Sequence, residues 1–344
     1  TNTRGNLMET TTKIAISPKI RSECPICGES QAAFLCRMGG DYLQFGEKGW
    51  QYNPTVMGFA GLDFATNPDI GCSYYECSNC GIYYLKEVFP IEDAYGSNRR
   101  QDKDLESRYL NTSTRLIRDM INRSHNVAQM TLLALESTGS DELEVLDYGF
   151  GGGFDLAVLK AFRIGKVVGF NPFDSLFDLT RRHMQTGITL VSSREEMEQL
   201  GPFDAIRCNA LLEHVEEPNV VLDHVYDLLK PGGIAWFYAP TVKRGEMRGY
   251  ARSVQRGMRV KRLHPGHLQF WNCERLPLST YVERRGFQII HNEYPIGSTD
   301  VTRIKGLLRL IGKHGKRSLH AAHAAATLKI GRYKSGSFFA RKTA

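Results

Sequence analysis

A glycine-rich turn directly after a short apolar run is the feature of this sequence that most restricts its fold. Residues 145–154 read Val-Leu-Asp-Tyr-Gly-Phe-Gly-Gly-Gly-Phe, and apolar residues at helical spacing follow. This pattern predicts a buried strand, a tight turn and a helix over 154–162. Glycines let a ligand approach the backbone closely, and a helix N-terminus presents free N–H groups. Taken alone, the loop equally suits a plain turn or a dinucleotide site.

The residues that follow continue to alternate between strand and helix patterns. Strands are predicted over 144–148, 166–170, 188–191, 203–208 and 234–239, and helices over 175–185 and 219–229. Helices are also predicted within 105–136 and over 276–285, with final strands over 287–290 and 337–340. Strands that alternate with helices indicate a mostly parallel sheet with helices on both faces. The fold class is therefore α/β.

Three sequence blocks occur in a fixed order along this pattern. They are D-Y-G-F-G-G-G from Asp147, F-D-A-I-R-C-N-A-L-L-E-H-V from Phe203 and L-L-K-P-G-G from Leu228. With them the chain resembles the class I methyltransferases that use S-adenosylmethionine, over about residues 141–290. The resemblance implies a Rossmann-like, seven-stranded, mostly parallel sheet. The second block lacks the N/D-P-P-F/Y motif of amino-methylating nucleic-acid enzymes and looks like that of small-molecule, sugar and lipid methyltransferases.

The same resemblance implies which residues contact the cofactor. The glycine loop would wrap its methionine portion, two serines after the third strand would lie near the adenine, and the residues after the fourth strand would line the cofactor and reaction pocket. The residues so identified are Asp147, Tyr148, Gly149, Gly151, Gly153, Asn171, Ser192, Ser193, Asn209, Ala210 and Leu211.

Asn171 is a departure from the family pattern. The family usually ends its second strand with Asp or Glu, which accepts hydrogen bonds from both ribose hydroxyls. An Asn side chain accepts one bond and donates another, so weaker cofactor binding is expected. Asp174, three residues on, could compensate. A modified cofactor or a degenerate, inactive site are the alternatives that Asn171 leaves open.

Four of the eight cysteines form two Cys-x-x-Cys-Gly pairs, at Cys24 and Cys27 and at Cys77 and Cys80. Two such turns supply the four thiolates of a closed tetrahedral zinc site, and the 49 intervening residues raise the loop-closure cost only slowly. We expect structural zinc, with Cys36 and Cys72 as alternative ligands; free buried thiols or a redox pair are the competing interpretations. Similar modules precede the catalytic domain in some sugar C-methyltransferases, and zinc sites occur in some ribosomal RNA methyltransferases.

Three histidines are candidates for the chemistry. Methyl transfer to a hydroxyl is assisted by a general base, often His. His214, His264 and His267 are expected closest to the pocket, and related small-molecule methyltransferases often carry a His at the position of His267. The competing interpretation is that His214 braces its helix.

Charge is distributed unevenly along the chain. Residues 241–344 hold 22 Lys and Arg against 5 Asp and Glu, whereas the remainder holds 22 against 32. The basic third suggests an anionic or lipid-linked acceptor, and a basic helical segment at 301–330 suggests peripheral membrane contact. A helix packed on the domain is the simpler interpretation of that segment.

The prediction is a cytoplasmic methyltransferase that acts on a sugar, a lipid-linked glycan or a natural-product precursor, with O-methylation as the expected reaction. An RNA methyltransferase is the rival enzyme, with nucleic acid the less favoured partner, and a non-catalytic scaffold with a degenerate cofactor site is the rival from another class. We expect a tail at 1–20, whose first seven residues precede Met8 and resemble a cloning remnant, a zinc module at 21–97, a helical linker or lid at 98–140, and the catalytic domain at 141–344 with an insertion at about 243–273.

Overall fold

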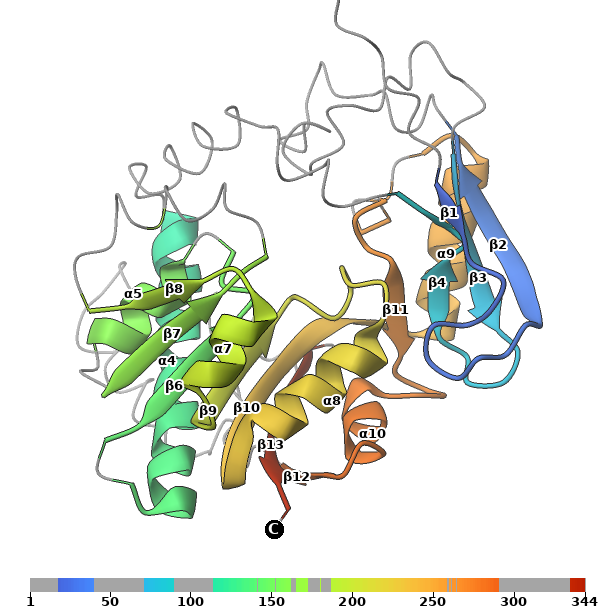
Figure 1. Cartoon of the computed structure of the whole chain (residues 1–344). Helices are drawn as coiled ribbons and strands as arrows, with labels where there is room; N and C mark the ends of the chain where they lie inside the picture. Colours follow the sequence, from blue (N-terminus) through green and yellow to red (C-terminus); the bar gives the residue numbers. More distant parts are fainter. Residues whose placement is uncertain are drawn as a thin grey trace, which may run out of the picture.

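The computed structural model describes residues 18–39, 71–89, 114–140, 142–151, 153–161, 165–172, 180, 187–258, 260, 262–263, 265–290 and 335–343. Their main feature is an eleven-stranded sheet (Figure 1). The half that the sequence predicts to be catalytic, called the catalytic half below, has the order β8-β7-β6-β9-β10-β13-β12. The first five of these strands pair in parallel, and β13 is antiparallel to both neighbours. The bounds are β6 Glu144–Tyr148, β7 Lys166–Phe170, β8 Thr189–Val191, β9 Phe203–Asn209, β10 Leu229–Val242, β12 Phe287–Ile290 and β13 Ser335–Lys342. The predicted seven-stranded, mostly parallel α/β sheet is confirmed.

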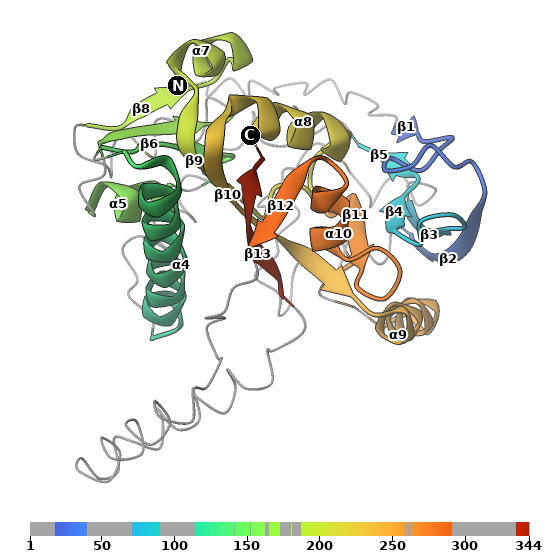
Figure 2. The ribbon, with the colours of Figure 1, turned by 90° about the horizontal axis from the view of Figure 1, so that it is seen from below.

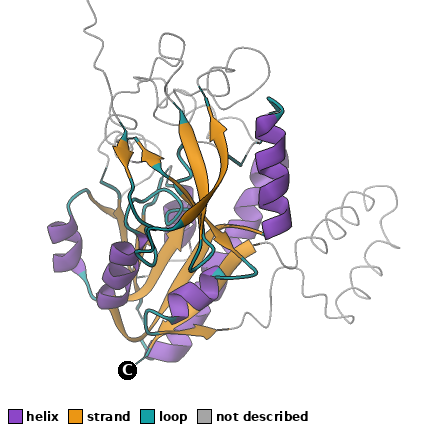
Figure 3. Ribbon diagram, turned by 90° about the vertical axis from the view of Figure 1, so that its right-hand side faces the viewer, coloured by secondary structure: helices purple, strands orange, loops and turns teal. Residues whose placement is uncertain are grey.

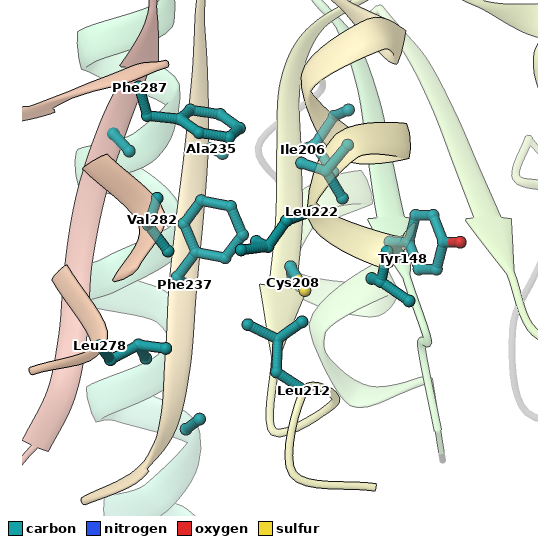
Figure 4. Close-up of a cluster of buried hydrophobic side chains, with 14 of the residues drawn as sticks. Tyr148, Ile206, Cys208, Leu212, Leu222, Ala235, Phe237, Leu278, Val282 and Phe287 are labelled. Carbon is teal, nitrogen blue, oxygen red and sulfur yellow. The ribbon is translucent and has the colours of Figure 1, made fainter. Parts of the chain in front are cut away.

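Helices cover both faces of this half of the sheet (Figure 2). On one face lie α4 Thr114–Thr138 and α5 Phe154–Ala161, which share a core with Trp236 and Phe339. On the other lie α7 Arg194–Leu200, α8 Pro218–Leu228 and α10 Leu278–Glu283, which pack over Phe237. Figure 4 shows this second core, in which Leu222 of α8 faces Cys208 and Phe237 of the sheet.

The cysteine-rich segment continues the same sheet. Its strands β2 Ala32–Met38, β3 Cys72–Cys77 and β4 Tyr83–Leu85 form an antiparallel meander, and β4 pairs with β11 Gln269–Asn272. β11 in turn pairs in parallel with the last residues of β10. Because β10 is long, its residues 234–240 pair with β13 and its last two residues pair with β11, so it joins the two halves (Figure 1). Figure 3 shows the helices in purple around the strands in orange, seen from the right-hand side of Figure 1. A short ribbon, β1 Lys19–Ile20 with β5 Glu87–Val88, lies beside the meander.

One helix, α9 Arg244–Gln255, covers the meander and builds a core of its own. Its Met247, Ala251 and Val254 are buried against Met38, Tyr74 and other residues of β2–β4 and β11. Beside this buried face, α9 carries exposed arginines at every fourth position, at Arg244, Arg248 and Arg252. The segment expected only as a basic insertion is therefore an amphipathic helix that ties the cysteine-rich strands to the catalytic half.

Several predicted boundaries differ from the structure. The helix α7 was not predicted, although Ser193 caps it by accepting a hydrogen bond from the Glu196 N–H. Residues 230–233, which separate the predicted helix at 219–229 from the predicted strand at 234–239, belong to β10, with a register shift between Leu229 and Ile234. The predicted segments at 301–330 and nearly all of 175–185 lie outside the described residues. Among the helices that the structure describes, none is both long and apolar enough to cross a membrane.

Candidate active site

The glycine loop follows β6 at the carboxyl edge of the sheet. Gly149, Gly151 and Gly153 have φ of 80°, 52° and 74°, in the left-handed region that favours glycine. The Gly149 N–H donates to Phe170 O at 2.8 Å, which fastens the start of the loop to the end of β7. A Cβ on Gly151 would meet nothing within 4 Å, so the loop is open on that side. An open, positive-φ loop at a helix N-terminus suits a ligand such as S-adenosylmethionine.

The loop after β9 reaches the same place. A Cβ on Gly149 would come within 3.0 Å of Leu211 Cδ1, so the two loops touch. Ala210 has φ 51°, a strained conformation for a residue with a side chain, and its N–H donates to Tyr238 O at 2.8 Å. The structure thus brings Gly149 and Leu211 together, with Ala210 and the half-buried Asn209 preceding Leu211 on the same loop. Strain held by a backbone hydrogen bond is typical of functional loops.

The other expected cofactor residues lie at the ends of β7 and β8. Asn171 is buried, and its N–H donates to Val191 O at 3.2 Å. Ser192 and Ser193 follow β8 directly, and the Ser193 hydroxyl serves as the cap of α7. The Tyr148 side chain packs in the core, with its ring edge-on to the rings of Phe170 at 5.0 Å and His224 at 5.8 Å. Its hydroxyl contacts His224 Nδ1 of α8 at 3.2 Å, so the Tyr148 side chain is engaged with α8.

Asp147 takes part in a buried ionic cluster that the sequence did not predict. The Arg207 guanidinium contacts Asp147 through one nitrogen and Asp155 of α5 through another. All three side chains are at most 4% exposed. The parallel register places Arg207 opposite Asp147 on one side and opposite Trp236 on the other, whose ring it covers. The expected site residue Asp147 is therefore engaged with the protein itself.

A second cluster lies on the loop that continues from Leu211. The ligand-capable atoms of Glu213, His214 and His267 all lie within 4.8 Å of one another. His214 Nδ1 contacts Gly266 O at 2.5 Å, and His267 Nδ1 contacts Arg262 O at 3.0 Å. A backbone carbonyl accepts only from a protonated nitrogen, so these contacts place a proton on Nδ1 of both rings and leave Nε2 as the acceptor when the imidazole is neutral.

Burial sets the electrostatics of this cluster. It raises the pKa of Glu213 to about 8 and lowers the pKa of His214, because a charge is disfavoured away from water. The rings of His214 and His267 are 5.0 Å apart, and His267 also packs edge-on against Phe270. Two imidazoles and a carboxyl group thus lie close together where the loop after Leu211 meets the residues before β11. His264, the third expected histidine, lies outside the described residues.

The Glu213–His214 loop is held by β11 and by the cysteine-rich strands. The buried Gln269 amide donates to Leu212 O and to Val215 O, and the Leu268 N–H donates to Glu213 O at 2.7 Å. The Tyr74 hydroxyl of β3 donates to His267 O at 2.7 Å. Gln269, Leu268 and Tyr74 belong to no sequence motif, because their roles depend on the pairing of β4 with β11.

The four expected metal ligands converge on one point. The Sγ atoms of Cys24, Cys27, Cys77 and Cys80 lie within 4.8 Å of one another, with Cys24–Cys80 at 3.6 Å and Cys27–Cys77 at 3.5 Å. Zinc with sulfur ligands at about 2.3 Å sets tetrahedral sulfur–sulfur distances near 3.8 Å. The residues present therefore fit the metal.

Cys36 and Cys72, the alternative ligands, are not in this group. They are buried on β2 and β3 in the α9 core, apart from the four clustered cysteines. Desolvation raises the pKa of Cys36 to about 11, as expected for an inert buried thiol.

The cysteine knuckles are bonded to the catalytic half. The Asn219 amide, in the first turn of α8, donates to Pro25 O at 3.3 Å and Ile26 O at 3.1 Å, and its oxygen accepts from the Tyr281 hydroxyl. The Arg21 guanidinium donates to Glu216 O at 2.8 Å. These bonds involve Glu216 and Asn219, which follow His214 within five residues, so the cysteine-rich segment directly supports the His214 loop.

Comparison with known proteins identifies the family. The profile of the methyltransferase-domain family matches residues 116–292, just over half of the chain. The chain belongs to this family. Its residues 116–292 form a class I, S-adenosylmethionine-dependent methyltransferase domain, in agreement with the strand order and the glycine loop. This methyltransferase is similar to the ubiquinone biosynthesis O-methyltransferase of Shewanella pealeana, with 32% identity over 139 residues, 38% of this chain and 57% of that protein.

The corresponding enzyme of Chromobacterium violaceum is 31% identical over 149 residues, which are 42% of this chain and 57% of that protein. The chain therefore spans little more than half the length of these curated relatives. Among solved structures, magnesium protoporphyrin IX methyltransferase from Synechocystis PCC 6803 has a TM-score of 0.45 and 15% identity, over 74% of this chain and 98% of that one. This likeness concerns the fold alone.

Proposed function

We propose that this methyltransferase transfers a methyl group from S-adenosylmethionine to a hydroxyl oxygen of a small organic acceptor. The observation that carries the proposal is the contact between Gly149 and Leu211, which joins the cofactor loop to the loop bearing Glu213 and His214. The curated relatives support oxygen as the methylated atom, because their names describe O-methyltransferases. A sugar, a lipid-linked glycan or a natural-product precursor is the proposed class of acceptor.

The protein's own residues would supply position and a route for the proton. When bound, S-adenosylmethionine supplies an electrophilic methyl group, and the loops at Gly149–Gly153, Asn171, Ser192 and Asn209–Leu211 would hold it. In-line transfer gains most from correct placement of the two reactants. The acceptor hydroxyl would lie at the Nε2 side of His214 and His267, whose Nδ1 protons are held by backbone carbonyls. Nε2 can then accept the hydroxyl proton as the new bond to oxygen forms.

The first test is turnover with a ¹³C-methyl-labelled cofactor. The purified protein is incubated with phenols, sugar nucleotides and lipid-linked sugars, and products are analysed by ¹³C NMR, which separates O-methyl from C-methyl and N-methyl carbons. An O-methyl product is expected. RNA as the methylated product, or binding of RNA that weakens steeply with salt, would replace this proposal with the nucleic-acid reaction. Binding of S-adenosylhomocysteine without any product would leave the cofactor site standing and reject the acceptor classes.

The second test concerns His267. Replacing it with alanine is expected to lower kcat about a hundredfold, in the range of lost general-base catalysis, while the Kd for S-adenosylhomocysteine changes little. The matched control is His224→Gln, a histidine on α8 that contacts Tyr148 and Glu198 instead of the pocket. Equal kcat in His267→Ala and wild type would remove His267 from the mechanism.

We also propose that the four clustered cysteines hold one structural zinc ion. A site closed by four thiolates has no open position for chemistry. Metal analysis of protein prepared without chelators should give one zinc per chain, lost in Cys27→Ser and retained in the control Cys273→Ser, a cysteine outside the cluster. A zinc-free wild type with full activity would contradict the assignment.

A further inference from the structure

A buried arginine closes the cofactor loop at its base. Asp147 precedes the first loop glycine by two residues, and Asp155 follows Gly153 by two residues. The guanidinium of Arg207, from the neighbouring strand β9, contacts both carboxylates with different nitrogens. One side chain therefore ties the strand before the loop to the helix after it. Two carboxylates in different elements can be held in this way by the planar, forked guanidinium, whereas a lysine offers a single nitrogen.

Burying this ionic cluster contributes little net free energy to folding, because its charges lose their hydration. Among the residues whose burial the structure describes, Arg207 is the only Lys or Arg that is buried, and the two carboxylates are buried with it. Removing three charges from water costs several kcal/mol each, and replacing such clusters by apolar side chains is often neutral or stabilising. The cluster stands at the two ends of the glycine loop, where a fixed backbone shape matters for ligand binding.

We propose that Arg207 is a positioning residue for the cofactor: by clamping Asp147 to Asp155, it holds the Gly149–Gly153 loop in the shape that binds S-adenosylmethionine. Arg207 acts through the loop. The guanidinium of Arg207 also lies over the indole ring of Trp236 on β10, with Cζ 5.4 Å from the ring centroid. The register of β6, β9 and β10 fixes all of these groups relative to the loop.

A loop that is ordered only part of the time binds its ligand more weakly in proportion, since the apparent Kd is the intrinsic Kd divided by the ordered fraction. If loss of the clamp lowers the ordered fraction to about a tenth, the Kd rises about tenfold. Wild-type protein and variants therefore differ in cofactor affinity even where they are equally folded. This inference rests on the proposal that the loop holds the cofactor.

The test uses variants that separate positioning from stability. Arg207→Met alone leaves two buried carboxylates without their cation and is expected to destabilise the protein. Arg207→Met with Asp155→Asn removes the clamp but retains the formal charge of the cluster, which is −1 in both proteins. We expect this double variant to recover much of the lost unfolding midpoint, yet to bind S-adenosylhomocysteine at least about tenfold more weakly. Arg207→Lys should lie between it and wild type.

Hydrogen exchange of peptides covering 147–156 gives the second measurement. Exchange in the double variant should be faster than in wild type, while exchange of the β13 peptide stays unchanged. The control is Arg285→Met, which breaks a partly exposed pair with Asp223 at 3.4 Å. A double variant with wild-type Kd and wild-type exchange would overturn the proposal, as would a fully active Arg207→Lys. Wild-type protein that binds S-adenosylhomocysteine without protecting 147–156 would instead reject the loop as the cofactor site.

Discussion

Gly149→Ala and Gly151→Ala form a matched pair that measures the contact between the cofactor loop and Leu211. Both glycines have positive φ, so each alanine carries a backbone cost of about 1–2 kcal/mol. The surroundings differ. The new Cβ at Gly151 meets nothing within 4 Å, whereas at Gly149 it meets Leu211 Cδ1 at 3.0 Å and Cδ2 at 3.4 Å.

Gly149→Ala should therefore lower the free energy of unfolding further than Gly151→Ala does. Leu211 is half-buried and must move by a few tenths of an ångström, so the added cost belongs at the low end of overpacking penalties, about 1 kcal/mol. Urea unfolding without cofactor measures both values and excludes effects of ligand binding. Combining Gly149→Ala with Leu211→Ala removes the obstructing methyl groups, so the difference between the two glycine sites should disappear.

Equal destabilisation by Gly149→Ala and Gly151→Ala would refute the reasoning, because the backbone cost would then be the whole effect. A Leu211→Ala background that leaves the difference intact would also refute it. In that case the two loops do not touch, and the Gly149–Leu211 contact on which the proposed active site rests would be wrong.

Three further predictions follow from single contacts. Gly169→Ala places a Cβ within 3.0 Å of the buried Leu156 and Phe150 and the partly buried Leu190, and it should lower the free energy of unfolding in urea by about 1–3 kcal/mol. In contrast, Gly245→Ala, with nothing within 4 Å in the first turn of α9, should be neutral or stabilising. Tyr74→Phe removes the hydrogen bond to His267 O, so it should lower the free energy of unfolding by about 0.5–1.5 kcal/mol and lower kcat without changing zinc content. An unchanged kcat would show that Tyr74 of β3 does not support the active site. Asn219→Ala removes both bonds to the cysteine knuckle, and faster hydrogen exchange at 211–217 with full zinc content is expected; exchange equal to wild type would show that the knuckle does not hold that loop.

Local patterns in the sequence were sufficient to predict the strands of the catalytic half. Short runs of apolar residues mark β6, β7, β8 and the second half of β10, whereas Asp204 and Arg207 interrupt the apolar residues of β9. The glycine loop fixes where β6 ends. The helices α7 and α9 were missed for different reasons. α7 is only seven residues long, with a single buried residue, Met197. The many arginines of α9 favoured an exposed basic insertion, although its buried residues Met247, Ala251 and Val254 are at helical spacing.

The candidate site could be predicted only as far as its residues belong to local motifs. The glycine loop and the cysteine pairs are contiguous signals, and the structure brings the residues within each together. Arg207 and Gln269 could not be found in this way, because their importance depends on which strand lies beside them. Arg207 faces Asp147 through the β6–β9 register, and Gln269 reaches Val215 O because β11 follows the end of β10.

These cross-strand contacts also explain why the cysteine-rich segment and the methyltransferase fold form one working unit. β11 pairs with β10 on one side and with β4 on the other, and His267 lies just before it. The carbonyl of His267 is fixed by Tyr74, and the loop at Glu216 is fixed by Arg21. The acceptor side of the proposed site is thus built against the cysteine-rich strands, while the cofactor side is built from β6–β9. Metal loss should therefore disturb acceptor turnover before it disturbs cofactor binding, and measuring both on chelated protein distinguishes this division from a general loss of structure.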